Sequence, residues 1–254
     1  MAAGLIHQSA MLRHRIIPIL LLKNSRMVKT IKFDSYRDVG NPIMTARIYD
    51  AQRADELVFL DIEASEEDRG FLTETLKRVS SECFMPLGAG GGVKTVADIR
   101  LLLASGADKA VINTAAFDRP DFIREAAAVF GSSTIVVSID VRNKPDGGYE
   151  VYVQGGKRAT GFDPIAYAKK MEALGAGEII LMSIDREGTM SGPDIPLISS
   201  VADAISVPVI AGGGVAAIDD FRRIYEEGHA NAVAAGSIFH FTDQSIIKTR
   251  THLA

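Results

Sequence analysis

The sequence predicts one α/β domain, a (β/α)8 (TIM) barrel built from two duplicated half-barrels. Three observations carry this prediction: eight short apolar runs, amphipathic stretches of helix length behind most of them, and a glycine motif that recurs about half the chain later. With 254 residues, of which 47% are hydrophobic, the chain is long enough to bury the core of such a domain. A doubly wound open sheet is the alternative that shares the alternation of strands and helices.

The predicted strands are apolar runs without strict polar alternation, which is typical of parallel strands buried on both faces. They cover residues 15–22, 56–62, 84–89, 109–114, 134–140, 178–184, 207–212 and 231–237. The stretch TVADIRLLLASGA predicts an amphipathic helix, with Val96, Ile99 and Leu102 on its apolar face and Gly106 as its stop. The stretch PIAYAKKMEALGAG repeats this design and stops at Gly175.

Residues 141–161 interrupt this alternation and predict a β-hairpin that turns at Asp146-Gly147-Gly148. The hairpin follows the fifth strand, so we expect it on the face that carries active sites in barrels of this kind. No segment has the composition of a linker, so residues 11–254 are predicted to form a single barrel domain. Residues 1–10 lack the basic start and apolar block of a signal peptide, and we expect them to be a disordered extension.

Composition argues against several classes of function. The formal net charge of −4 gives no electrostatic basis for binding nucleic acid, and no apolar run approaches the ~20 residues of a membrane helix. The single cysteine, Cys83, has no partner for an intrachain disulfide and is expected in the core. His7, His14, His229 and His240 share no ligand spacing, so no metal site is predicted. These features together predict a cytoplasmic protein.

Two glycine motifs lie at equivalent positions of the predicted halves, LGAGGGVKTVADI at residues 87–99 and VIAGGGVAAIDDF at residues 209–221. The glycines are 122 residues apart by their numbers, and the stretches GADKAVINTAAF and GHANAVAAGSIF have the same offset. Glycine lets a backbone approach a ligand closely and leaves N–H groups free to bind an anion. The predicted phosphate sites are Gly90, Gly91, Gly92, Asn113 and Thr114 in the first half, and Gly212, Gly213, Gly214, Gly236 and Ser237 in the second. Two sites imply a ligand with anions at both ends, whereas the alternative is that the glycines only turn the chain.

Carboxylates follow three of the predicted strands, at Asp61, Asp140 and Asp185. A carboxylate at the C-terminal end of a barrel strand serves as an acid or a base when burial raises its pKa. Asp140 is the predicted catalytic residue. Asp185 is a candidate for substrate binding, although helix capping or loop support is the alternative role for both Asp61 and Asp185. The first strand ends in three leucines, and Lys29 beyond it is a candidate phosphate or substrate contact.

The chain resembles the HisF family, the cyclase subunit of imidazole glycerol phosphate synthase. The similarity runs from about Arg13 to Phe241, and its most specific stretches are DELVFLDI, GADKAVINTAAF, GAGEIILMSIDREGT and SIFHF. The resemblance implies a barrel of two half-barrels that works as a lyase with a glutaminase partner. It further implies that the partner releases ammonia at the bottom of the barrel, and that the ammonia travels through the core to the top. No cofactor is implied, because the nitrogen comes from the partner.

The resemblance also implies an ammonia gate, a ring of four charged residues at the bottom of the barrel. The chain matches all four positions, at Arg15, Glu56, Lys109 and Glu178. Buried alternating charges cost stability unless they are fully paired, so their presence suits a role beyond packing. Four ordinary strand-end charges are the alternative. Asp108 matches the family residue that faces the glutaminase.

The chain departs from the family where the chemistry should occur. The family uses two catalytic aspartates, which end the first and fifth strands; Asp140 matches the second, but Leu21 stands at the first position. Since leucine cannot transfer a proton, the cyclisation should fail or be slowed by ~100- to 10,000-fold. Gly155 and Met182 replace a serine and a threonine of the family, and Glu187 replaces an aspartate.

This pattern resembles HisF-like paralogues of bacterial surface-polysaccharide clusters. Those proteins act with a glutaminase and an additional amidotransferase to convert an acetamido sugar into an acetamidino sugar. The favoured function is therefore an ammonia-using synthase subunit in lipopolysaccharide or O-antigen synthesis, with a phosphorylated or nucleotide-sugar substrate. Two alternatives stay open: histidine biosynthesis with a displaced acid, and a phosphate-binding barrel that channels ammonia without chemistry of its own. Leu21 argues against the first and Asp140 argues mildly against the second.

Overall fold

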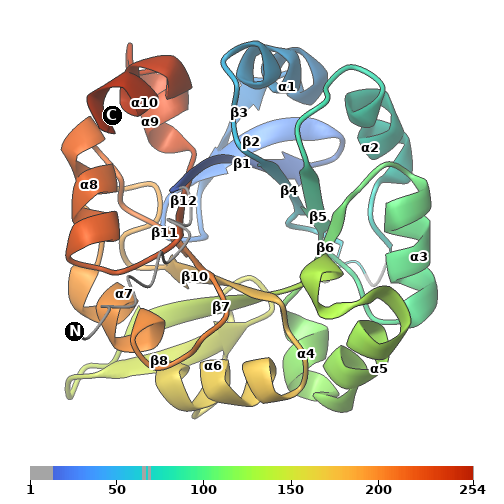
Figure 1. Ribbon diagram of the computed structural model, residues 1–254, viewed down its shortest axis with the longest axis vertical. Coiled ribbons are helices and arrows are strands. Elements are labelled where there is room, and N and C mark those ends of the chain that lie inside the picture. The colour runs from blue at the N-terminus through green and yellow to red at the C-terminus, as the bar shows by residue number, and fades with distance from the viewer. Residues whose placement is uncertain (1–13, 65–66, 68–69, 254) are drawn as a thin grey trace, which may run out of the picture.

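The computed structural model of the protein describes residues 14–64, 67 and 70–253, and it shows a closed parallel barrel surrounded by helices (Figure 1). The barrel strands are β1 (Arg15–Lys23), β4 (Leu57–Asp61), β5 (Leu87–Gly90), β6 (Lys109–Ile112), β7 (Ile135–Asn143), β10 (Glu178–Ser183), β11 (Val209–Gly212) and β12 (Ala232–Ala235). Each pairs in parallel with its neighbours, and the pairing of β10 with β7 completes the closed path. The (β/α)8 barrel is confirmed and the open sheet is wrong.

Helices connect the strands and cover the outside of the barrel (Figure 1). They are α1 (Pro42–Ala51), α2 (Thr73–Ser80), α3 (Val96–Ala104), α4 (Thr114–Asp118), α5 (Asp121–Phe130), α6 (Pro164–Ala173), α7 (Ile195–Ala202), α8 (Ile218–Glu226), α9 (Ser237–Phe241) and α10 (Ile246–Leu253). The predicted helix behind the first glycine motif is α3. It begins after the N-cap Thr95, whose side chain accepts a hydrogen bond from Asp98 N, and it ends before Gly106.

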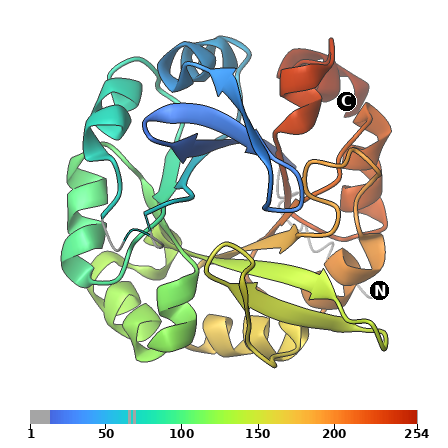
Figure 2. The same cartoon turned by 180° about the vertical axis from the view of Figure 1, so that it is seen from behind.

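An antiparallel extension follows the first strand of each half. After β7 the chain forms β8 (Tyr149–Val153) and β9 (Arg158–Ala159), which confirms the hairpin that Asp146-Gly147-Gly148 predicted. After β1 it forms β2 (Arg26–Thr30) and β3 (Tyr36–Gly40), a second extension that the sequence did not predict. Seen from behind, both extensions lie across one end of the barrel (Figure 2).

The two halves repeat element for element. Asn41 caps α1 by accepting hydrogen bonds from Ile43 N at 2.9 Å and Met44 N at 3.2 Å, and a proline follows it. Asp163, 122 residues later by number, caps α6 with the same geometry and the same following proline. The glycine motifs also coincide, since β5 and β11 end at Gly90 and Gly212. The duplication therefore includes helix caps as well as strands.

Side chains of the barrel strands alternate between two hydrophobic cores. Along β1, Ile16, Leu20 and Leu22 pack in the layer between the strands and the helices, whereas Ile17, Ile19 and Leu21 belong to a smaller cluster inside the barrel. This alternation follows from the two-residue period of a strand. Because both faces are buried, the run needs no polar alternation, which explains why β1 was recognisable as an apolar run.

Some predicted boundaries differ from the structure. The strand predicted at residues 84–89 begins at Leu87, because Phe84 is 94% exposed and its N–H donates to Asp50 Oδ1 rather than to a ladder. Thr114 and Ser237 lie beyond their strands, at the first positions of α4 and α9. The extension predicted at residues 1–10, and the domain boundary at residue 11, lie outside the described residues.

Candidate active site

A large cavity opens where the barrel strands end. Its volume is about 1010 Å³, and its walls come from the ends of β1, β4 and β7, from the first glycine loop and from both antiparallel extensions. Its lining includes Leu21, Lys29, Phe33, Asp61, Gly91, Gly92, Asn113, Thr114, Asp140, Gly155, Met182 and Glu187. The structure thus brings most of the sequence-predicted residues of the first half to one end of the barrel, as expected for a barrel enzyme.

Asp140 lies at the centre of a hydrogen-bond network in this cavity. It is 7% exposed, and it accepts hydrogen bonds from Ser138 Oγ at 3.2 Å and Asn113 Nδ2 at 3.1 Å. Burial raises the pKa of its carboxyl group to about 7, and the two hydrogen bonds oppose part of that rise. A carboxyl group with such a pKa can either give or take a proton near neutral pH.

Leu21 occupies the corresponding place in the first half. Leu21 pairs with Leu60 across β1 and β4, while Asp140 pairs with Met182 across β7 and β10, and Met182 is the counterpart of Leu60 in the repeat. The Leu21 side chain is 8% exposed and belongs to the apolar cluster inside the barrel. The cavity that holds Asp140 is therefore apolar at the equivalent position of the first half, where Leu21 takes the place of a second carboxylate.

The first glycine loop borders the large cavity. Gly91 has φ of +117°, and a Cβ built there would lie 2.2 Å from Asp61 O, so packing alone already requires glycine. Asn113 and Thr114 lie beside it: Asn113 also donates to Ser138 O at 2.9 Å, and Thr114 Oγ1 accepts from Gln154 N at 3.1 Å. Gly90 does not line the cavity and abuts Val111. The turn-only interpretation of these glycines therefore stays open beside anion binding.

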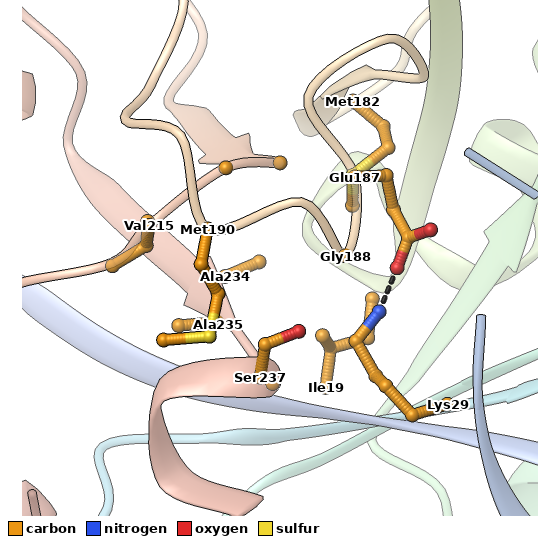
Figure 3. A pocket seen from close by; sticks show the side chains of 13 residues that line it. Ile19, Lys29, Met182, Glu187, Gly188, Met190, Val215, Ala234, Ala235 and Ser237 are labelled. Carbon is orange, nitrogen blue, oxygen red and sulfur yellow. Dashed lines mark ion pairs between the residues drawn. The ribbon is translucent and has the colours of Figure 1, made fainter. Parts of the chain in front are cut away.

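The second glycine loop borders a much smaller pocket, of about 30 Å³ (Figure 3). Gly213, Gly214, Gly236 and Ser237 line it, together with Lys29, Glu187 and Met190. Ser237 Oγ is buried and has no hydrogen-bond partner among the described residues. Gly212 does not line this pocket, since Met182 packs where its Cβ would stand. The two predicted phosphate sites are therefore unequal in the structure.

Lys29 and Glu187 form a buried ion pair between these cavities (Figure 3). Their side chains are 8% and 5% exposed, and Glu187 Oε2 also accepts a hydrogen bond from Thr30 Oγ1 at 2.9 Å. Burial lowers the pKa of the Lys29 ammonium to about 8. The sequence had identified Lys29, but not that Glu187 would be its partner.

The other two strand-end aspartates have structural contacts. Asp61 lines the cavity and its Oδ1 accepts hydrogen bonds from Glu63 N and Ala64 N, both at 3.2 Å. Asp185 accepts from Asn143 N at 2.8 Å and is absent from the residues that line either cavity. Loop support, the alternative role for both residues, is thus what their contacts provide.

Four charged side chains meet at the opposite end of the barrel. Arg15 Nη1 lies 3.0 Å from Glu56 Oε2 and 3.0 Å from Glu178 Oε1. Lys109 Nζ completes the ring, 2.7 Å from Glu56 Oε2 and 2.8 Å from Glu178 Oε2. Burial raises the pKa of Glu56, which is 3% exposed, and Lys109 opposes the rise. The structure therefore brings the four predicted gate residues into one closed ring of alternating charge.

Asp108, beside this ring, is exposed and accepts a hydrogen bond from Leu87 N at 2.8 Å. It thereby holds the first residue of β5, a structural role that the sequence did not predict. The wall of the large cavity carries four further basic residues that were not predicted as site residues, Lys23, Lys94, Arg119 and Lys157. Lys94 lies within the first glycine motif, two residues after Gly92, and this position could have indicated it.

No group of three or more metal-ligating side chains lies together in the part of the chain that the structure describes. Within the same residues, no helix combines the length and the apolar character needed to cross a membrane. Cys83 is buried, as expected, and its Sγ donates to Val79 O at 3.1 Å.

A closed parallel barrel with a buried carboxylate and paired glycine loops at the C-terminal ends of its strands defines the class of (β/α)8-barrel enzymes. The family model described as "Histidine biosynthesis protein" matches residues 15–245, which is nearly the whole barrel. The chain therefore belongs to this family, whose members are histidine-biosynthesis enzymes of the isomerase or cyclase type.

Proposed function

We propose that the protein is a HisF-like, ammonia-using synthase subunit of a glutamine amidotransferase complex, acting in acetamidino modification of a lipopolysaccharide or O-antigen sugar. Its partners would be a glutaminase and an additional amidotransferase, and its substrate a phosphorylated or nucleotide sugar. The observation that carries the proposal is the combination of a complete charge ring at one end of the barrel with a half-complete catalytic pair at the other.

Ammonia transfer is supported by how side chains stack along the barrel axis. On three strands, a ring residue is followed two positions later by an interior apolar residue and four positions later by a residue of the cavity. For β10 these residues are Glu178, Ile180 and Met182, and on β1 the ring residue Arg15 is followed by Ile17 and Ile19. An apolar layer between the ring and the cavity suits a small neutral molecule such as ammonia and disfavours ions.

Asp140 is the proposed acid–base catalyst. Its pKa of about 7 suits proton transfer, and Asn113 and Ser138 hold its two oxygens in place. Leu21 removes the second proton-transfer group that a cyclase of this family needs. In acetamidino formation the ammonia nitrogen replaces the carbonyl oxygen of the acetamido group, and that oxygen leaves as water. One carboxylate that can both take and give a proton is compatible with this step.

Histidine biosynthesis is the second candidate, and the retained Asp140 and ring favour it. A channel without chemistry of its own is the third, and Leu21 favours that one. The genes beside the coding sequence would separate the first two, because surface-sugar genes are expected for the proposed function and histidine genes for the second.

Complementation of a histidine auxotroph that lacks its cyclase tests the proposal directly. The wild-type chain should not restore growth, and the purified chain should form little or no imidazole glycerol phosphate even with excess ammonia. Leu21→Asp should restore at most a trace, because Gly155 and Met182 still lack the polar groups of the family. Leu21→Asn is the matched control, since its amide is polar but transfers no proton at neutral pH. Robust growth with the wild-type chain would overturn the proposal and favour histidine biosynthesis.

A further inference from the structure

The two glycine loops are equivalent by sequence, but in the structure they border cavities of very different size. The first loop, with Gly91, Gly92, Asn113 and Thr114, forms part of the wall of the cavity of about 1010 Å³. The second, with Gly213, Gly214, Gly236 and Ser237, faces a pocket of about 30 Å³. The free space at the second loop, enough for one or two water molecules, is therefore far smaller than the space at the first loop.

Described side chains and backbone close the second loop. The loop after β10 lies over it: Gly192 N donates to Gly214 O at 2.9 Å, and a Cβ at Gly214 would lie 2.2 Å from Gly192 O. Met190, from the same loop, lines the pocket, as Figure 3 shows. The contact between Gly192 and Gly214 is made by backbone atoms, so side-chain rotation leaves this part of the wall in place.

A carboxylate of the chain itself already stands in this pocket. Glu187 lines it and pairs with Lys29 (Figure 3). The Lys29 side chain lies beside Gly236. Glu187 also accepts from Thr30 Oγ1, and its own carbonyl accepts from Lys32 N at 2.9 Å, so it is fixed to the loop between β2 and β3. The cation that would neutralise a bound phosphate is thus occupied, and a second anion would face a like charge at close range.

We propose that Glu187 serves as a built-in anion at the second glycine loop, so that the ligand of this protein carries a phosphate or diphosphate at one end only, bound at the first loop. The inference rests on the proposed function, because it assumes that the first loop binds phosphate. The basic side chains of the cavity support this orientation of the ligand, with its phosphate end at the first loop. Lys94, Arg119 and Lys157 lie on the wall of the large cavity and not of the small pocket. The other end of the ligand lies against Leu21 and Met182 and is uncharged.

Inorganic phosphate, followed by backbone amide chemical shifts of the ¹⁵N-labelled full chain, is the probe. In the wild type, the amides of Gly91, Gly92, Asn113 and Thr114 should shift and saturate, whereas those of Gly213, Gly214 and Ser237 should not. Glu187→Gln, which frees Lys29, should give the second set saturable shifts as well. Glu227→Gln is the matched control, because it removes the same charge from an exposed pair with Arg223 and should leave the wild-type pattern.

Each outcome bears on the proposal. Saturable shifts of both sets in the wild type would overturn the single-anion ligand while leaving phosphate recognition by the proposed enzyme intact. Absence of shifts in both sets would overturn phosphate recognition itself, and with it the substrate class of the proposed function. If Glu187→Gln folds but the amide shifts of Gly213, Gly214 and Ser237 still do not change with phosphate, Glu187 is not what excludes the anion. The wild-type titration decides the main point even if that variant fails to fold.

Discussion

At the residue scale, Asp140 and Leu21 show that a single side chain decides whether a strand end carries a proton-transfer group. Both lie near the end of the first strand of their half-barrel, and both pair with equivalent neighbours, Met182 and Leu60. The sequence predicted their positions because buried parallel strands are readable as apolar runs that end at the active face. It could not predict the pKa of Asp140, because burial in the folded barrel raises that pKa, and the hydrogen bonds from Ser138 and from Asn113, on another strand end, oppose the rise.

Asp140→Asn should abolish proton transfer while keeping the shape of the site. We expect the native activity to fall by ~100- to 10,000-fold. The same change should alter stability with a definite sign: the pKa of about 7 lies above the unfolded value of 3.8, so the wild type loses stability as pH rises through this range. The variant lacks this loss. Between pH 5 and pH 8, its free energy of unfolding should therefore rise by about 2–3 kcal/mol relative to that of the wild type.

Urea unfolding at the two pH values measures this difference. Asp146→Asn is the matched control, because Asp146 is an exposed aspartate in the hairpin turn and its replacement should leave the pH dependence unchanged. A variant with the same pH dependence as the wild type would show that Asp140 is ionised throughout, and that it is not a neutral-pH acid.

Glu187 is the residue whose role the sequence did not predict. Its difference from the family aspartate was visible, but its contacts with Lys29 and Thr30 join segments that are 157 residues apart in the chain. A side chain longer by one methylene reaches across a distance that only the folded barrel defines. Long-range side-chain pairs of this kind carry no local sequence signal.

At the element scale, the duplicated helix caps give a direct measure of the repeat. Asn41→Ala and Asp163→Ala each remove an acceptor from two backbone N–H groups, at the starts of α1 and α6. Each should lower the free energy of unfolding by about 1 kcal/mol. Because the two helices lie on opposite sides of the barrel (Figure 1), the effects should add to within about 0.5 kcal/mol in the double variant.

Chemical denaturation of the three variants tests this expectation. Lys169→Ala on α6 is the control, since Lys169 is exposed and alanine is a good helix former. A large loss from one cap and none from the other would mean that the two helices contribute unequally despite their matching geometry.

The extensions after β1 and β7 explain why one hairpin was predicted and the other was not. The turn after β7 contains Asp146-Gly147-Gly148, a strong local signal. The turn after β2 instead places Lys32 and Phe33 at φ of +56° and +62°, a conformation that non-glycine residues rarely adopt. Glu187, which accepts from Phe33 N at 3.4 Å, helps to hold this turn from outside. A turn stabilised by tertiary contacts cannot be predicted from its own residues.

At the scale of the whole molecule, the sequence predicted the barrel and its duplication well, because both depend on patterns repeated along the chain. The eight apolar runs supply the strands, and the offset of 122 residues supplies the symmetry. The inequality of the two glycine loops was not predictable, since it arises from the loop after β10 folding over the second one. The strands and helices of the two halves therefore keep the symmetry of the sequence, whereas the surroundings of the two glycine loops do not.

The charge ring joins strands of both halves and offers the test of ammonia transfer. Lys109→Ala removes one of the two cations that bridge Glu56 and Glu178 and leaves Arg15 alone beside two carboxylates. We expect stability to fall by about 3–5 kcal/mol. With a glutaminase partner, glutamine use should continue while glutamine-dependent product formation falls, and activity with free ammonium should stay largely intact. Glutamine consumption and product are measured in parallel, with glutamine and with ammonium as the nitrogen source.

Two further variants separate a gate from a structural role. Arg223→Ala breaks an exposed ion pair with Glu227 and should change neither nitrogen source. Glu56→Gln combined with Lys109→Met keeps the ring neutral overall, so it should recover much of the stability lost in Lys109→Ala while leaving glutamine and product uncoupled. Equal loss with glutamine and with free ammonium, in a variant that is stably folded, would show that the ring only stabilises the barrel. Because that outcome leaves the cavity and Asp140 untouched, it would argue against ammonia passage without removing the case for an enzyme.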